Sequence, residues 1–360
     1  MAKQQPNARY LVHTPAELAS NHAADYQRRQ GDPGVKFGVP AVDARVIPMH
    51  PGDMTCILAR PGHGKTTLLA RAARQEAEEI RKRGTQASEC VVYVTWETSA
   101  EELVSLFYAA DGDMSATDLA WGRVPVDNVL RKAAKQASVP IWVIGHGIAN
   151  AGKVMPRMTP DVVFAAIESM AEDFGVKPRL LLFDYMQLIP VTGTTSRVEQ
   201  VTEAAIRVKE LALRIGAPAM VGVQARREVD TRDDKTPEMH DAQWASGIEQ
   251  VADKVFGIWR PYVTDNEKGL LVVKHEGREK GLKITPNLAI LKLRKQRGDV
   301  GYYIAHTWGW LWRLYYAVTP DRVVADAIRK FANRADESAH GGTLYVPVVY
   351  VDGKREVMDD

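Results

Sequence analysis

From about residue 36 to residue 316, short apolar runs alternate with longer segments whose apolar residues recur every three or four positions. The short runs predict strands, and the longer segments predict helices. The predicted strands include residues 54–59, 90–95, 141–144, 179–183 and 219–223, followed after Val251 by β-rich segments at 288–293 and 301–312. Strands that alternate with helices indicate an α/β fold with a mostly parallel central sheet and terminal β-hairpins.

Capping signals at the ends of the predicted helices support this pattern. Ser99 and Ser196 each stand three residues before a glutamate, which is the arrangement of a capping box. Gly84 and Gly216 follow predicted helices, where a left-handed backbone conformation commonly ends a helix. The helix boundaries therefore agree with the periodicity.

Two shorter regions flank this core. The chain is expected to divide into an N-terminal arm (1–33), a central α/β domain (34–316) and a C-terminal extension (317–360). Residues 14–29 of the arm predict a helix with few apolar residues, opened by a proline. In the extension we expect a helix over 321–333 and a β-hairpin around Asp352-Gly353, giving an α+β segment.

The composition excludes some classes of protein. The 360 residues include 47 Lys and Arg against 45 Asp and Glu, so the net charge of +2 rules out a uniformly basic protein but allows a locally basic groove. Cys56 and Cys90 lie in apolar runs without zinc-ligand spacing, which favours a reduced, cytoplasmic protein. No apolar run approaches the roughly 20 residues that span a membrane, so we expect no membrane partner.

Residues 59–66 read Ala-Arg-Pro-Gly-His-Gly-Lys-Thr and fit a phosphate-binding loop, with alanine at the usual first glycine. They lie between a predicted strand and a predicted helix, which makes a chance glycine-rich turn improbable. Inward-facing backbone N–H groups and the helix N-terminus attract phosphates, Lys65 can reach the β- and γ-phosphates, and Thr66 can bind Mg²⁺. The candidate nucleotide-binding residues are Arg60, Pro61, Gly62, His63, Gly64, Lys65, Thr66 and Thr67.

Three polar residues end other predicted strands. Asp184 follows a buried strand, where a phosphate-loop protein has its second Mg²⁺-organising residue. Tyr185 rather than a glutamate comes next, so the base that activates water must lie elsewhere, and Glu97 is the candidate. Gln224 ends a further strand, where its amide can sense the γ-phosphate. A simpler interpretation is that Asp184 caps a strand, Glu97 is a solvated turn residue and Gln224 is an ordinary polar residue at a strand end.

Several of these motifs together resemble the ATPase domain of DnaB-type replicative helicases over residues 34–316. They occur in the family's order along the chain. They are residues 34–40 (Gly-Val-Lys-Phe-Gly-Val-Pro), Pro51-Gly52-Asp53, the phosphate loop, Trp96-Glu97, residues 184–188 (Asp-Tyr-Met-Gln-Leu), Gln224 with Arg226 and Arg227, residues 246–250 (Ser-Gly-Ile-Glu-Gln) and residues 295–298 (Lys-Gln-Arg-Gly).

The resemblance implies a RecA-like P-loop NTPase whose extra strand lies between the phosphate-loop strand and the Asp184 strand. It also implies ATP and Mg²⁺ at the subunit interfaces of a hexameric ring. Glu97 is then the catalytic carboxylate, and Lys295 and Arg297 reach the neighbouring subunit's nucleotide. The implied function is that of an ATP-dependent helicase or translocase that acts on single-stranded DNA in replication.

The sequence departs from the family in two places. Only some 33 residues precede the match, which leaves no room for the family's primase-binding domain, so we expect a separate primase or loader and consider residues 14–29 as a linker helix. The family's DNA-contacting Arg-Glu is replaced around Trp244, which either stacks on a base or packs under its loop. The candidate DNA-binding residues are Arg197, Arg226, Arg227, Gln243, Trp244, Ser246 and Gly247, with Arg232 and Lys235 nearby.

Two other functions stay open at the level of sequence. Acidic residues interleave with the basic ones after Gln224, so that loop is only mildly basic and can also be a solvated loop. One alternative is a recombinase-like or regulatory ring that binds DNA without processive unwinding. The other is an assembly module that uses ATP only to hold a complex together.

Overall fold

The computed structural model describes residues 12–44, 46–110, 114–194, 196–232, 235–243, 247–264, 270–275, 278–284, 288–295, 302–308, 311–317, 348–351 and 354–357. At positions 41 and 110 and in the strands within 270–283, 302–317 and 348–357, only the backbone is described. The chain forms two compact units, residues 1–34 and residues 35–360.

The first unit contains the helix expected in the N-terminal arm, α1 (Pro15–Gly31). Thr14 caps it: the Thr14 hydroxyl accepts a hydrogen bond from the backbone N–H of Glu17, and the Glu17 carboxylate accepts from that of Thr14. No residue of α1 is buried, and Leu18 and Tyr26 are exposed. Its sparse apolar residues therefore form no core within the unit.

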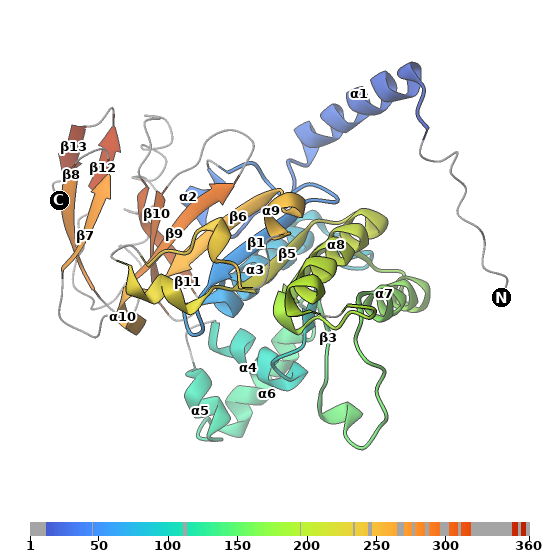
Figure 1. The fold of residues 1–360 in the computed structure, drawn as a ribbon. Helices are drawn as coiled ribbons and strands as arrows, with labels where there is room; N and C mark the ends of the chain where they lie inside the picture. Colours follow the sequence, from blue (N-terminus) through green and yellow to red (C-terminus); the bar gives the residue numbers. More distant parts are fainter. Residues whose placement is uncertain are drawn as a thin grey trace. The chain divides into compact units, whose positions relative to one another are not determined.

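The second unit is built on a nine-stranded sheet with the order β11-β10-β9-β6-β1-β5-β4-β2-β3 (Figure 1). Strands β6, β1, β5, β4, β2 and β3 run parallel, and β9, β10 and β11 add to β6 as antiparallel strands. The predicted α/β class with terminal hairpins is confirmed. The strand bounds are β1 Met54–Ala59, β2 Glu89–Thr95, β3 Ile141–Ile144, β4 Lys177–Asp184, β5 Ala219–Gln224, β6 Lys254–Trp259, β9 Leu288–Lys295, β10 Tyr302–Trp308 and β11 Leu311–Ala317.

Helices connect these strands and cover the sheet. They are α2 Pro40–Asp43, α3 Lys65–Arg83, α4 Ala100–Ala110, α5 Ala116–Ala120, α6 Val126–Gln136, α7 Pro160–Phe174, α8 Arg197–Ile215, α9 Ile248–Val251 and α10 Pro261–Thr264. Short 3₁₀ turns occur at η2 Ile148–Asn150, η3 Met186–Leu188, η4 Arg227–Thr231 and η5 Met239–Asp241. The capping boxes of Ser99 and Ser196 and the left-handed Gly84 and Gly216 lie where the sequence predicts them.

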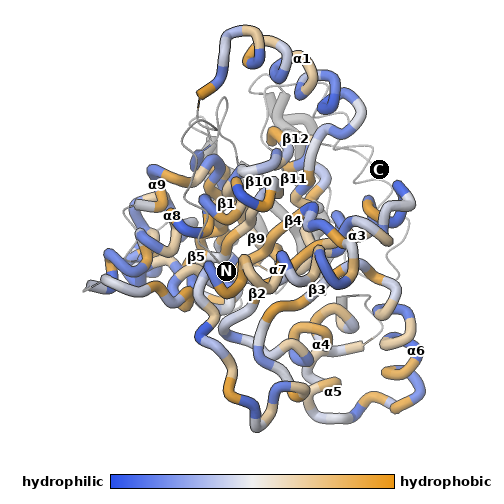
Figure 2. The backbone as a smooth tube through the Cα atoms, turned by 90° about the vertical axis from the view of Figure 1, so that its right-hand side faces the viewer, coloured by the Kyte–Doolittle hydropathy of each residue, from blue (hydrophilic) through white to orange (hydrophobic). Residues whose placement is uncertain are grey.

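Two apolar layers enclose the sheet, because successive side chains of a strand point to opposite faces. Along β1, Ile57 and Ala59 belong to the layer that includes α3 and α4, whereas Cys56 and Leu58 belong to the layer that includes α7 and α8. Figure 2 shows hydrophobic colour along the strands of the sheet. Cys56 and Cys90 are buried free thiols, as their apolar surroundings predict.

The end of the chain was predicted less accurately. Residues 301–312 read as one β-rich segment, but β10 ends at Trp308 and β11 begins at Leu311. Two further hairpins form separate small sheets, β7 (Leu270–His275) with β8 (Arg278–Lys283) and β12 (Val348–Val351) with β13 (Lys354–Val357). The second matches the hairpin expected around residues 352–353, and the helix expected over 321–333 lies outside the described residues. In the described part of the chain, no helix is long and apolar enough to span a membrane.

Candidate nucleotide-binding site

The predicted phosphate loop, Glu97, Asp184 and Gln224 lie at one edge of the sheet. Strands β1, β5, β4 and β2 are adjacent and parallel, so their carboxyl ends lie together. Ala59 pairs with Gln224, and Thr95 pairs with Asp184. Strand β5 is the extra strand expected between the phosphate-loop strand and the Asp184 strand.

The phosphate loop joins β1 to α3 through two glycines with left-handed backbones. Gly62 has φ +78° and Gly64, the N-cap of α3, has φ +96°, conformations that residues with a Cβ rarely adopt. Lys65 is 9% exposed, and its Nζ donates to the carbonyl oxygens of Ala59 and Arg60 at 3.3 and 3.4 Å. Burial lowers the pKa of Lys65, while Asp184 and Glu97 act to raise it. The ammonium group therefore bends back over its own loop and faces two carboxylates.

Asp184 is held beside the start of α3. Its Oδ2 accepts hydrogen bonds from the Thr66 hydroxyl at 2.8 Å and from the Tyr93 hydroxyl at 3.0 Å. The residue is 1% exposed, and its Oδ1 is buried without a hydrogen-bond partner among the described residues. Burial raises the pKa of the carboxyl. A carboxylate oxygen without a partner next to a threonine hydroxyl provides the hard oxygen ligands that Mg²⁺ prefers.

Glu97 follows β2 on the same edge and is exposed. Burial of part of the side chain and the nearby Asp184 raise its pKa, whereas Lys65 lowers it. The preceding Trp96 is fixed on both sides: its ring stacks on Phe183 with centroids 6.1 Å apart, and its Nε1 donates to the Met158 carbonyl at 2.9 Å. Glu97 is therefore a solvent-accessible carboxylate on a firmly held turn.

Contacts of two residues, Arg60 and His63, hold the outer side of the phosphate loop. Nε of Arg60 lies 3.0 Å from Oδ2 of Asp230 in η4, and Nη1 of Arg60 donates to the Ala225 carbonyl at 3.0 Å. Nδ1 of His63 accepts the backbone N–H of Arg260 at 2.9 Å. Burial lowers the pKa of His63 to about 4, so its imidazole is neutral near neutral pH. No sequence motif points to Asp230 or Arg260, which lie more than 160 residues from the loop.

The candidate DNA-binding residues have different surroundings. Arg226 and Arg227 are exposed after β5. Arg197 is exposed at the start of α8, where its Nη2 donates to the Gln187 carbonyl at 2.5 Å. Arg232, a neighbouring candidate, forms an ion pair of 2.5 Å with the buried Asp241, so its charge is neutralised within the chain.

The segment that leads into α9 is only partly described. Gln243 is half-buried, and Gly247 is buried. A Cβ at Gly247 would lie 2.4 Å from Cγ2 of Thr202, so this position has no space for a side chain. Trp244 and Ser246 lie outside the described residues.

Of the two residues expected to reach a neighbouring subunit, Lys295 ends β9. Its Nζ donates to the Glu249 carbonyl of its own chain at 2.7 Å. Arg297 lies outside the described residues. The structure therefore places Lys295 without testing its role at a subunit interface.

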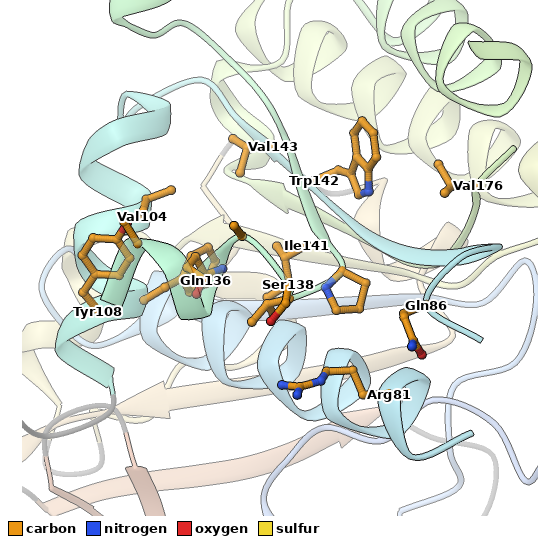
Figure 3. Close-up of a pocket in the computed structure, with 15 residues that line it drawn as sticks. Arg81, Gln86, Val104, Tyr108, Gln136, Ser138, Ile141, Trp142, Val143 and Val176 are labelled. Atoms are coloured by element: carbon orange, nitrogen blue, oxygen red, sulfur yellow. The ribbon is translucent and has the colours of Figure 1, made fainter. Parts of the chain in front are cut away.

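A separate hollow of about 750 Å³ lies beside β3, the edge strand of the sheet (Figure 3). It is lined by parts of α3, α4, α6 and β3, including Arg81, Tyr108, Gln136 and Trp142. None of the predicted site residues lines it. The carboxyl edge of β1, β5 and β4, rather than this hollow, is therefore the candidate nucleotide site.

A phosphate loop, a Thr–Asp pair and an extra strand between β1 and β4 define the class of RecA-like P-loop NTPases. Residues 34–303 match the family described as the DnaB-like helicase C terminal domain. The chain belongs to this family, and the resemblance found in its motifs is confirmed.

Similar proteins agree with this assignment. The replicative DNA helicase DnaB of Rickettsia typhi is 28% identical over 279 residues, which are 74% of this chain and 54% of that protein. The replicative DNA helicase DnaC of Bacillus subtilis is 26% identical over 273 residues, which are 73% of this chain and 56% of that protein. The chain thus spans about half the length of these helicases.

Two solved structures share the fold. The ATPase domain of G40P has a TM-score of 0.67 at 18% identity, covering 84% of this chain and 99% of that chain. A DnaB-like replicative helicase, described with its interactions with primase, has a TM-score of 0.65 at 17% identity, covering 84% of this chain and 67% of that chain. At these identities the likeness concerns the RecA-like fold.

Proposed function

We propose that this chain is the motor of a ring-forming, ATP-dependent DNA helicase or translocase that acts on single-stranded DNA in replication. The observation that carries the proposal is the 2.8 Å contact between Thr66 and Asp184, beside the buried Lys65 and a buried carboxylate oxygen that has no hydrogen-bond partner in the described part of the chain. The family supports the choice of DNA, because relatives in it are named replicative DNA helicases.

In this proposal, the site residues have distinct roles in ATP hydrolysis. The loop residues 60–67 and the Lys65 ammonium bind the phosphates, while Thr66 and Asp184 hold Mg²⁺. The metal, when bound, offsets the negative charge of the phosphates. Glu97 orients the attacking water and accepts its proton, which its exposed position at the same edge permits. The amide of Gln224, at the end of β5, senses whether the γ-phosphate is present.

The remaining parts of the proposal concern the assembly. Arg297 and Lys295 would complete the site of a neighbouring subunit in a hexameric ring, with Lys295 exchanging the Glu249 carbonyl for a phosphate. The proposed domains are residues 1–33, 34–316 and 317–360. In the first of them, helix α1 would be a linker helix that packs on an adjacent subunit. Its lack of buried residues supports this role, because a helix gains stability mainly by packing.

The single-stranded DNA would contact the loops after β4 and β5 and before α9. The exposed Arg226 and Arg227 supply positive charge for phosphates. Arg197, Gln243, Trp244, Ser246 and Gly247 are the other proposed contacts. A separate primase or loader, and a cytoplasmic location, complete the proposal.

The test compares DNA-stimulated ATP hydrolysis with unwinding of a forked duplex by the full chain. We expect both activities in the wild type and neither in Lys65→Ala. Lys82→Ala, which removes an exposed lysine from the same helix, is the control and should behave as the wild type.

Other outcomes identify the alternatives. DNA stimulation without unwinding would favour a recombinase-like or regulatory ring. ATP binding that supports assembly without turnover would favour a non-enzymatic assembly module. Absence of both ATP binding and DNA binding would overturn the proposal.

A further inference from the structure

A buried glutamine side chain joins the two sides of the proposed motor site. Gln187 lies in η3, three residues after Asp184, and is 3% exposed. Its Oε1 accepts the backbone N–H of Gln224 at 3.0 Å, and its Nε2 donates to the Gln224 carbonyl at 3.1 Å and to the Gln243 carbonyl at 3.2 Å. The carboxamide nitrogen makes two hydrogen bonds and the oxygen accepts one, so both ends of the group are engaged.

These contacts take the place of the backbone pairing that β5 lacks near its end. The pairing of β4 with β5 stops at Phe183 and Val221, although β5 continues to Gln224. The Gln187 carboxamide pairs with both the N–H and the C=O of Gln224, as the N–H and C=O of one opposite residue do in an antiparallel pair of strands. It thereby holds the end of β5 on the side where β4 no longer pairs with it.

The same carboxamide also holds the segment before α9. The Gln224 carbonyl accepts from the Gln243 N–H at 2.9 Å, and Ala225 forms an isolated antiparallel bridge with Ala242. Gln187 closes this short pairing at Gln243, next to the proposed DNA-contacting positions 244–247. One short turn and one side chain therefore connect Asp184 to Gln243.

We propose that Gln187 is a positioning residue that couples the Asp184 end of the nucleotide site to Gln224 and to Gln243. This inference rests on the proposed function, because it assigns a route between ATP and DNA. Glutamate cannot replace the residue, since a carboxylate has no N–H to donate and would face two carbonyl oxygens. A purely structural role would affect all activities of the protein equally, whereas coupling affects only their dependence on each other.

The experiment measures DNA-stimulated over basal ATP hydrolysis, and the affinity for a single-stranded oligonucleotide with and without a non-hydrolysable ATP analogue. The variants are Gln187→Met and Gln187→Glu, and thermal unfolding of each establishes that it is folded. Gln86→Met, the same change at an exposed glutamine after α3, is the control. We expect both Gln187 variants to lose about tenfold in the stimulation ratio, a size typical of coupling between sites. Their basal turnover and KM for ATP should change by less than about threefold, within the scatter of such comparisons.

The coupling also acts on the binding equilibria themselves, so the oligonucleotide affinity of these variants should no longer depend on the ATP analogue. Equal losses of basal and stimulated turnover would show a structural role and overturn the inference. Wild-type stimulation in both variants would overturn it as well. The wild type itself tests the proposed function: without DNA stimulation in that protein, the proposed function fails, independently of any variant.

Discussion

The Thr66 hydroxyl donates a 2.8 Å hydrogen bond to Oδ2 of Asp184, and this contact joins the start of α3 to the end of β4 across 118 positions of the chain. Tyr93 donates to the same oxygen, while Oδ1 is buried and has no partner among the described residues. Burying a carboxylate that is satisfied on one oxygen costs stability. Such a cost is typical of a residue that a site needs for its chemistry.

The first prediction follows from this cost. Burial raises the pKa of the Asp184 carboxyl, so the ionised carboxylate is unfavourable in this environment. Asp184→Asn removes that buried charge. Without Mg²⁺, the variant should therefore be about 1 kcal/mol more stable toward urea than the wild type. Its ATP turnover should fall at least about a hundredfold, because the metal ligand is lost. Thr66→Ser keeps the hydroxyl and should retain most of the turnover. A less stable Asp184→Asn variant that still hydrolyses ATP would contradict the assignment.

The second prediction concerns Glu97. Glu97→Gln keeps the size of the side chain but cannot accept a proton, so turnover should fall by about 10²–10⁴. Nucleotide affinity, measured with a fluorescent ATP analogue, should stay within a few-fold of the wild-type value. Glu168→Gln, at an exposed position of α7, should leave both unchanged.

The pH dependence gives a second check on Glu97. Burial and the nearby Asp184 raise the pKa of Glu97, and a base is active only when ionised. Wild-type turnover should therefore decline on acidification at a higher pH than the ordinary pKa of a glutamate would give. Unchanged turnover in Glu97→Gln would show that another residue activates the water.

The inner part of the site could be predicted from the sequence, because a parallel sheet brings the carboxyl ends of its strands together. Asp184 and Gln224 end their strands, and Lys65 and Thr66 begin the helix that follows the loop after β1, so knowledge of the class of fold was enough to place them together. The order of β1, β5 and β4 followed from the resemblance to a family and not from periodicity.

The outer part could not be predicted, because its contacts depend on which loops lie side by side. Asp230 reaches Arg60 only because η4 follows the strand next to β1, and the backbone N–H of Arg260 reaches His63 only because β6 lies on the other side. From the sequence, Arg232 is one of several basic residues near the predicted DNA contacts, but in the fold it forms an ion pair with the buried Asp241. A sequence does not show which charges are already paired.

The third prediction uses His63, whose Nδ1 accepts the Arg260 N–H and whose pKa burial lowers from 6.5 to about 4. Between these two pKa values the unfolded chain binds the proton and the folded chain does not, so stability falls as the pH falls. From about pH 7 to about pH 5 the loss due to His63 should be about 2 kcal/mol. Urea unfolding of the nucleotide-free protein at both pH values measures it.

The matched variant for this test is His63→Asn, whose Oδ1 can accept the same N–H but does not titrate. Its loss of stability between the two pH values should be smaller than that of the wild type by about 2 kcal/mol. The carboxylates common to both proteins cancel in the comparison. An equal loss in both proteins would show that His63 is not held neutral in the fold.

The last prediction tests whether each site is shared between two subunits. Lys65→Ala removes the loop lysine, and Arg297→Ala removes the residue proposed to act on a neighbour's nucleotide, so each variant alone should be inactive. In a mixed ring, a site that joins the intact Lys65 of one variant to the intact Arg297 of the other is complete. An equal mixture should recover about a quarter of the wild-type turnover, because half of the subunits supply each intact side of a head-to-tail interface. Steady-state ATP hydrolysis over a series of mixing ratios measures this, with a maximum expected at equal amounts. A mixture that stays inactive at every ratio, while native mass spectrometry shows mixed rings, would contradict the role of Arg297 in the neighbouring site.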